Sequence, residues 1–244
     1  MYIKKTSRPD FTILLVIGFL VIISLTVLSS IAGGLFPLYF VYIALGALVF
    51  TLFSRIGFGV LTYFYKHLYV FSVVFLMLPL IIGQVTRGTV RWIPIGALTI
   101  QPAEIVRPLL LVFFATYLTK KTIDFERLAK AFGLLIPPTF LILVQPSLGV
   151  TVLTLIGFLG ILFSIGLPKK YFAIGAALFL LFLPVSWQMM RDYQKDRVIA
   201  FIDPTKDPLG AGYNSLQSMV SVGSGEIFGR GLGKGIQTQL AFLP

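Results

Sequence analysis

The sequence predicts an all-α polytopic membrane protein with about seven transmembrane helices and one long extracytoplasmic loop. Of its 244 residues, 57% are hydrophobic and 12% are charged, whereas soluble domains carry roughly 25% charged residues. Long uncharged runs recur up to residue 190, while the residues from 191 on are polar, glycine-rich and without such a run. We therefore expect a transmembrane domain over 1–190 and an extracytoplasmic loop over 191–244.

The predicted spans follow from the length of the runs, because a helix needs about 20 mostly apolar residues to cross the hydrocarbon core. The first, sixth and seventh runs are clear, and the third and fifth are short. Lys66 and His67 separate the third run from the apolar stretch before it, and Glu104 and Arg107 lie in the first turns of the fourth. The seven runs are Phe11–Ala32, Phe36–Phe53, Leu68–Ile82, Ala103–Thr119, Ala131–Gln145, Leu148–Leu167 and Tyr171–Met190.

The first run follows the basic residues Lys4, Lys5 and Arg8, as the hydrophobic segment of a signal peptide would. It is longer than the roughly 7–15 apolar residues of a cleaved segment, and further runs come after it. We expect it to be an uncleaved first transmembrane helix.

The basic residues also predict the orientation of the helices. If the N-terminus is cytoplasmic, the inner segments are rich in lysine and arginine, and the short outer connections hold only Arg87 and Arg91, as the bias of basic residues toward cytoplasmic loops requires. Seven crossings then place residues 191–244 outside the cytoplasm. The inner basic residues are Lys4, Lys5, Arg8, Arg55, Lys66, Lys120, Lys121, Arg127, Lys130, Lys169 and Lys170.

The charge and the rare residue types exclude several classes of function. The formal net charge of +11 fits contact with anionic membrane lipids, because the basic residues flank apolar runs. The sequence has no basic stripe with interleaved aromatic residues, so it does not predict a nucleic-acid partner. With no cysteine and with His67 as its one histidine, the sequence offers no disulfide, thiolate metal site or histidine-based metal site.

The first candidate site surrounds the start of the fourth run. Glu104 and Arg107 are three residues apart, so they share a helix face and can pair. Two interpretations fit this spacing equally well: a functional pair at membrane depth, or an interfacial pair that caps the positive end of a helix. Trp92 beside Arg91 is typical of an aromatic anchor at the membrane interface. A glutamine–proline pair at 101–102 predicts the start of a helix.

The second candidate site is the predicted loop, whose mixed charges are typical of a solvated surface. Asp203 and Asp207 each precede a proline, a pairing that starts turns, so we expect both aspartates to shape the loop. Glycines alternate at 229, 231, 233 and 235, in a spacing that matches neither a dinucleotide-binding nor a phosphate-binding loop. We expect them to permit tight turns or a close approach of the backbone to a ligand.

Taken together, these motifs resemble the SEDS family (RodA, FtsW and SpoVE) of membrane proteins, which polymerise peptidoglycan glycan strands. Two blocks of residues carry the resemblance, and the motifs of the second are more similar to the rod-shape branch, RodA, than to the division branch, FtsW. The first block holds Arg91-Trp92, Gly96, Gln101-Pro102 and Glu104. The second runs from Tyr193-Gln194 to Leu243-Pro244 and includes Arg197, Asp203-Pro204, Asp207-Pro208, Gly212-Tyr213, Gln217-Ser218 and Gln237.

The sequence departs from the family pattern at several positions. Ala103 and Arg107 replace a serine and a lysine, and Ser147 and Val150 replace an aspartate and a threonine. Arginine keeps the charge of lysine but not its shape. The family loop also continues into a stretch with an aspartate regarded as essential, followed by three more spans. We therefore expect a C-terminally truncated member that is inactive alone.

The resemblance implies transfer of a glycan chain from an undecaprenyl-pyrophosphate carrier to a sugar hydroxyl of lipid II, in cell elongation and cell-shape maintenance. A carboxylate takes the acceptor proton, here the family aspartate beyond Pro244, and positive charge stabilises the departing diphosphate. The resemblance implies catalytic roles for Glu104, Trp92 and Arg107. It implies substrate binding by Arg87, Arg91, Gln101, Arg197, Gln217 and Ser218.

The resemblance further implies a class B penicillin-binding transpeptidase as partner and the bacterial cytoplasmic membrane as location. A divalent cation, Mg²⁺ or Mn²⁺, is expected for the chemistry, and no residue can be named as its ligand. Two alternatives stay open. A lipid II flippase or small-solute transporter fits the spans and the intramembrane charge, and a non-catalytic scaffold for a penicillin-binding protein fits the missing aspartate.

Overall fold

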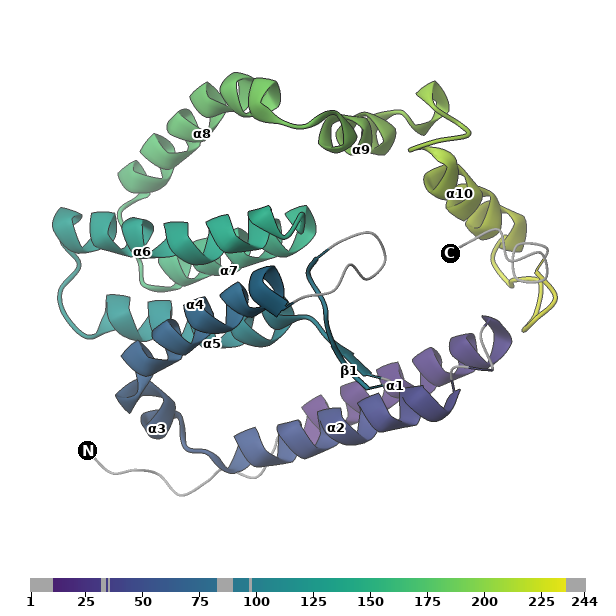
Figure 1. Ribbon diagram of the computed structural model, residues 1–244, viewed down its shortest axis with the longest axis horizontal. Coiled ribbons are helices and arrows are strands. Elements are labelled where there is room, and N and C mark those ends of the chain that lie inside the picture. The colour runs from purple at the N-terminus through teal and green to yellow at the C-terminus, as the bar shows by residue number, and fades with distance from the viewer. Residues whose placement is uncertain (1–10, 32–33, 35, 83–89, 97, 236–244) are drawn as a thin grey trace. The chain divides into compact units, whose positions relative to one another are not determined.

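The computed structural model describes residues 11–31, 34, 36–82, 90–96 and 98–235, and this part of the chain is almost entirely helical (Figure 1). One short hairpin interrupts the helices. The elements are α1 (Phe11–Ile31), α2 (Phe36–Arg55), α3 (Phe58–Tyr63), α4 (Tyr65–Ile82), β1 (Ile93–Ile95), β2 (Leu98–Ile100), α5 (Pro102–Thr119), α6 (Phe125–Val144), α7 (Leu148–Ser164), α8 (Lys169–Met189), α9 (Asp192–Ile202), the 3₁₀ helix η2 (Pro204–Lys206) and α10 (Tyr213–Gly225).

Each of the seven predicted spans coincides with a helix. Five of these helices are long and apolar enough to cross a membrane: α1, α2, α4, α5 and α6. The spans expected to be short reach 18 residues in α4 and 20 in α6, because polar residues such as Lys66 and Arg127 join their first turns. α7 is apolar but has 17 residues, and a crossing by α7 or α8 stays a prediction.

The chain divides into two compact units, which are described separately. One comprises residues 1–8 and 44–168, and the other comprises 9–43 and 169–244. The first unit therefore holds α3 to α7 with the hairpin, the second holds α1 and α8 to α10, and α2 spans the division. The predicted boundary at residue 190 divides the membrane segment from the loop. It is a different kind of division from these two units, which are defined by packing, and it stays a prediction.

The core of the first unit lies between α4, α5, α6 and α7, which pack side by side (Figure 1). The ring of Phe113 in α5 is 4.5 Å from that of Tyr69 and 5.0 Å from that of Phe114, whose ring is 4.9 Å from Phe158 of α7. Such aromatic pairs contribute about 0.5–1.5 kcal/mol each beyond their buried area. The fully buried apolar side chains around them include Leu76, Val106, Leu110, Phe114, Leu118 and Ile142.

An antiparallel hairpin of β1 and β2 directly precedes α5. Its register pairs Ile93 with Ile100 and Ile95 with Leu98, so the chain reverses between Ile95 and Leu98. Gly96 adopts a φ of 61°, which two-residue hairpin turns require and which glycine adopts without steric cost. These strands were not predicted, because three residues are too few to show an alternating pattern.

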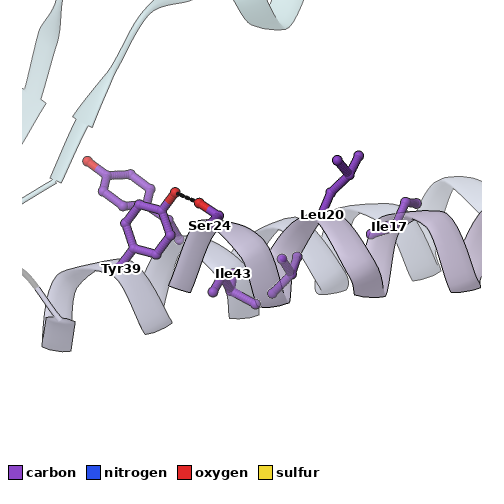
Figure 2. Close-up of a pocket in the computed structure, with 7 residues that line it drawn as sticks. Ile17, Leu20, Ser24, Tyr39 and Ile43 are labelled. Atoms are coloured by element: carbon purple, nitrogen blue, oxygen red, sulfur yellow. Dashed lines mark hydrogen bonds between the residues drawn. The ribbon is translucent and has the colours of Figure 1, made fainter. Parts of the chain in front are cut away.

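In the second unit, a hydrogen bond joins α1 to the beginning of α2. Ser24 Oγ and Tyr39 OH lie 2.5 Å apart (Figure 2). They border an open groove of about 480 Å³, none of whose lining residues is charged, so the groove does not offer the chemistry of a diphosphate site. The lining residues are Ile17, Leu20, Val21, Ser24, Tyr39, Tyr42 and Ile43.

Two aspartates fold the segment between α9 and α10. Asp203 Oδ1 accepts hydrogen bonds from the backbone N–H of Thr205 at 3.2 Å and from its hydroxyl at 2.5 Å. Asp207 accepts from the backbone N–H groups of Gly210 at 3.0 Å and Ala211 at 2.8 Å. The prediction that both aspartates shape the loop is confirmed.

Glycines complete this segment in two ways. Gly229, Gly231 and Gly233 have φ values of 72°, 91° and 71°, which confirms that they form turns. Gly212 is the N-cap of α10 and has an ordinary φ of −81°, but a Cβ there would collide with the backbone carbonyl of Pro204. Gly212 is therefore required for the close packing of η2 against α10.

Candidate functional site

Polar side chains gather at one end of the first unit, where α5 and α7 begin and where α4 and α6 end. We call this group the polar end and define it as Gln101, Glu104, Arg107, Gln145 and Ser147. Polar and ionisable groups inside a membrane bundle are costly unless they are paired, and for that reason they mark candidate functional sites.

The first contact of the polar end joins the starts of two helices. Gln101 occupies the N-cap position of α5 and Pro102 its first turn, which confirms the predicted helix start. The Gln101 side chain does not cap its own helix. Instead, Nε2 donates to Ser147 Oγ at 3.4 Å, and Ser147 is 4% exposed at the N-cap position of α7.

The second contact is the predicted ion pair. Arg107 Nη2 lies 2.5 Å from Glu104 Oε2, with 21% of the arginine side chain and 49% of the glutamate side chain exposed. Glu104 is in the first turn of α5, where the helix dipole favours a negative charge. The Nε of Arg107 is buried and has no acceptor among the described residues. The guanidinium therefore keeps a donor for a further anion.

The third contact ties α6 to α4. Gln145 is fully buried, and its Nε2 donates to the carbonyl oxygen of Leu76 at 2.6 Å. Its Oε1 is buried without a donor in the described part of the chain. A buried amide oxygen of this kind needs a water or ligand donor, because leaving it unpaired costs about 1–3 kcal/mol.

Arg91 and Trp92 lie beside the polar end. The pairing of Ile93 with Ile100 brings the residues just before β1 close to Gln101, which follows β2. The guanidinium carbon of Arg91 is 6.0 Å from the centre of the Trp92 ring, at the outer limit of a cation–π contact. Arg91 Nε is buried and has no partner in the ranges that the structure describes. The remaining predicted residue of this group, Arg87, lies outside the described residues.

The other predicted substrate-binding residues belong to the second unit. Arg197 is exposed on α9, and Gln217 and Ser218 lie on α10. The Ser218 hydroxyl donates to the carbonyl oxygen of Asn214 in its own helix at 2.7 Å. The structure thus groups the predicted site residues in two sets: one at the polar end and one on the two helices that pack on η2.

The described residues do not form a divalent-cation site. No three histidine, cysteine, aspartate or glutamate side chains in these ranges are placed to hold a metal ion, and Glu104 is engaged by Arg107. The expected Mg²⁺ or Mn²⁺ stays a prediction, and we derive no step from it.

The prediction of site residues missed Gln145 and Ser147. Gln145 was named only as the last residue of a predicted span and Ser147 only as a departure from the family pattern, and no role followed for either. A usable signal was present: a glutamine, a proline and a serine interrupt two apolar runs, and polar residues at that depth need partners.

The chain is similar in sequence to one family of bacterial proteins. The FtsW/RodA/SpoVE family model, described as a cell cycle protein, matches residues 8–244. The chain is 32% identical over 241 residues to the peptidoglycan glycosyltransferase MrdB of Escherichia coli K12, covering 96% of this chain and 65% of that protein. It is 35% identical over 183 residues to the probable peptidoglycan glycosyltransferase FtsW of Aliivibrio salmonicida, covering 73% and 45%.

The solved structures that resemble this chain include a member of the same family. A chain of a peptidoglycan synthase complex that coordinates polymerization and crosslinking matches with a TM-score of 0.76 at 28% identity, over 96% of this chain and 74% of that one. The rod shape determining protein RodA of Thermus thermophilus matches with a TM-score of 0.62 at 29% identity, over 70% and 59%. The chain therefore spans less than two thirds of the length of the MrdB and FtsW relatives named above.

Proposed function

The chain belongs to the FtsW/RodA/SpoVE family of cell cycle proteins, and we propose that it acts in a peptidoglycan glycosyltransferase. Its apolar helices and its bacterial relatives make it a multi-pass bacterial membrane protein. The names of the MrdB and FtsW relatives support the reaction type. We propose lipid II as the substrate, and cell elongation and cell-shape maintenance as the process.

The observation that carries this proposal is the incomplete hydrogen bonding of the Arg107 guanidinium. One of its nitrogens is held by Glu104, and its buried Nε has no acceptor among the described residues. The Arg107 side chain is 21% exposed, and an oxygen of a lipid-linked diphosphate would reach the guanidinium there and supply an acceptor. A charge placed in advance in a site that excludes water stabilises a departing diphosphate strongly, and guanidinium nitrogens match phosphate oxygens geometrically.

The remaining residues of the polar end would position this arginine. Glu104 fixes the guanidinium through the ion pair, and Gln101 fixes the start of α5 against Ser147. Arg91 would add a second cation near the carrier, with Trp92 shaping the wall of the site. Arg87, Arg197, Gln217 and Ser218 stay proposed substrate-binding residues.

We propose that the polar end faces the outer side of the cytoplasmic membrane and that the N-terminus is cytoplasmic. The opposite end of the first unit supports this orientation: it carries five basic residues, and the bias of such residues toward the cytoplasm is strong in short loops. These residues are Lys66, Lys120, Lys121, Arg127 and Lys130.

We further propose a class B penicillin-binding transpeptidase as partner, since polymerised strands must be crosslinked. A solved chain that resembles this one comes from a complex described as coordinating polymerization and crosslinking. A divalent cation, Mg²⁺ or Mn²⁺, stays a proposed cofactor that would offset diphosphate charge, and none of the residues named here is assigned as its ligand.

The experiment supplies purified lipid II, in detergent, to a longer family protein that contains residues 1–244, and resolves the products on a gel. We expect glycan polymer from the parent protein, and at least about a tenfold loss in Arg107→Ala, as for lost positioning and charge stabilisation. Arg107→Lys keeps the charge and should retain more activity. Arg230→Ala is the control, because Arg230 is exposed on the loop.

Two other outcomes would replace the proposal. Movement of labelled lipid II across vesicles without polymer would indicate a flippase. Binding of the transpeptidase with neither polymer nor movement would indicate a scaffold. Equal polymer yields from the parent and Arg107→Ala proteins would remove Arg107 from the site.

A further inference from the structure

The end of the first unit opposite the polar end is basic and aromatic. α4 begins there, α5 ends there and α6 begins there. We call this group the basic end and define it as Lys66, Lys120, Lys121 and Arg127 with Tyr65 and Tyr117. No role in the proposed reaction uses these residues.

Aromatic rings and the backbone fix two of the four cations. Lys120 Nζ lies 4.2 Å from the centre of the Tyr65 ring, and the guanidinium carbon of Arg127 lies 4.7 Å from the centre of the Tyr117 ring. Arg127 also donates from Nε to the carbonyl oxygen of Tyr117 at 3.0 Å, and from Nη2 to the same oxygen. These contacts hold the charges in place without neutralising them.

The nearby acidic residues are already engaged. Asp124 Oδ1 accepts from the backbone N–H of Arg127 at 2.7 Å and caps α6. Glu126 pairs with Lys130. Within the described ranges, Lys66, Lys120 and Lys121 therefore have no carboxylate in an ion pair. The basic end therefore carries positive charge that the described carboxylates do not neutralise, and an anion from outside the chain would be attracted to it.

Exposed aromatic side chains lie beside these cations. Tyr63 at the end of α3 is 76% exposed, and Phe125 at the start of α6 is 74% exposed. Aromatic residues at this level favour the boundary between headgroups and acyl chains. An anion that carries apolar chains would contact both the cations and these rings, whereas free phosphate would contact only the cations.

We propose that the basic end binds the headgroup of an anionic phospholipid. The phosphate oxygens would lie against Lys66, Lys120 and Lys121, and the acyl chains would run along the exposed aromatic side chains. Basic pockets at the ends of membrane helices bind such headgroups in general. The site does not depend on the proposed glycosyltransferase activity, so a failure of that activity leaves this proposal standing.

The test measures lipid retained by the purified chain after exchange into mixed micelles of phosphatidylglycerol and phosphatidylcholine. Native mass spectrometry counts each bound lipid. We expect the parent chain to retain more phosphatidylglycerol than phosphatidylcholine. In the triple variant Lys66→Gln, Lys120→Gln, Lys121→Gln, the ratio of bound phosphatidylglycerol to bound phosphatidylcholine should fall at least about tenfold. The matched control removes the same charge from the loop, with Lys195→Gln, Lys206→Gln and Lys234→Gln.

A second variant separates charge from folding. Replacement of the three lysines of the basic end by arginine keeps the charge and should keep the enrichment. Equal retention in the parent and triple glutamine proteins would overturn the proposal, as would an equal loss in the loop control. Displacement of phosphatidylglycerol by excess inorganic phosphate would overturn the proposal and assign the site to free phosphate instead.

Discussion

The side chain of Gln145 donates a hydrogen bond to the carbonyl oxygen of Leu76 at 2.6 Å, between residues 69 positions apart in the sequence. The glutamine is fully buried at the end of α6, so this contact ties α6 to α4 just before Ser147, which accepts the hydrogen bond from Gln101. The position of the candidate site thus depends on a neutral amide that carries no charge for the reaction.

This contact predicts that residue 145 tolerates an apolar substitution better than a charged one. Gln145→Glu replaces the donor by a carboxylate in a buried place, so we expect a loss of roughly 3 kcal/mol or more of stability. Gln145→Leu loses one neutral hydrogen bond of about 1 kcal/mol but also removes the unpartnered oxygen, so its cost is smaller. Thermal unfolding in detergent measures both. Gln194→Glu is the control, because Gln194 lies in the first turn of the exposed helix α9, where a negative charge is favourable. A glutamate variant as stable as the leucine variant would contradict the prediction.

The two ion pairs among the described residues of the first unit should contribute differently to the reaction. In a longer family protein that contains residues 1–244, Glu104→Gln weakens the hold on Arg107, and we expect at least about a tenfold lower rate of glycan polymerisation per folded protein. Glu126→Gln breaks the exposed pair with Lys130 and should leave the rate within about twofold, since surface pairs contribute little. The measurement is polymer yield normalised to the folded fraction from gel filtration. Similar rates in both variants would mean that the Glu104 pair only caps α5.

Two glycines of the loop should respond to alanine in opposite directions. Gly212→Ala places a methyl group against the Pro204 carbonyl, and we expect a loss of about 1–3 kcal/mol from the forced shift. Gly223→Ala lies inside α10 with open space around it and should stabilise that helix by up to about 1 kcal/mol. Limited proteolysis of the loop reports both changes. Equal protease sensitivity of the two variants would contradict the close approach at Gly212.

The Asp203 turn should lose stability in acid. Hydrogen bonds from the hydroxyl and then the backbone N–H of Thr205 hold the pKa of Asp203 below its ordinary value of 3.8. Because the pKa is lower in the folded state, its stabilising contribution is present above pH 3.8 and is lost as the pH falls through the folded pKa. Thr205→Val removes the first of these bonds, so its difference in melting temperature from the parent should be constant near neutral pH and shrink below pH 3.8.

The control for this titration is Ser224→Ala. The Ser224 hydroxyl donates to the backbone carbonyl of Ser221, which does not titrate. Its difference from the parent should therefore be the same at every pH. A Thr205→Val difference that is also independent of pH would exclude the proposed coupling to Asp203.

The sequence by itself determined the features that depend on neighbours along the chain. The length of each apolar run was enough to predict every long helix, because a membrane span is set by the thickness of the hydrocarbon core. The Glu104–Arg107 pair and the start of α5 at Pro102 followed from helical spacing and from proline chemistry. The turns at Asp203 and Asp207 followed from local backbone preferences.

Only the tertiary structure decided which helix ends meet. The bond from Gln101 to Ser147 joins residues 46 positions apart, and no periodicity in either run specifies the partner. The hairpin that brings Trp92 back toward Gln101 is likewise too short to leave a pattern. A run of apolar residues sets the length of a helix and places it in the membrane. It does not specify a partner, because all such runs are similarly apolar. The choice among them is made by packing of specific rings and by the few polar groups that must find a partner out of water.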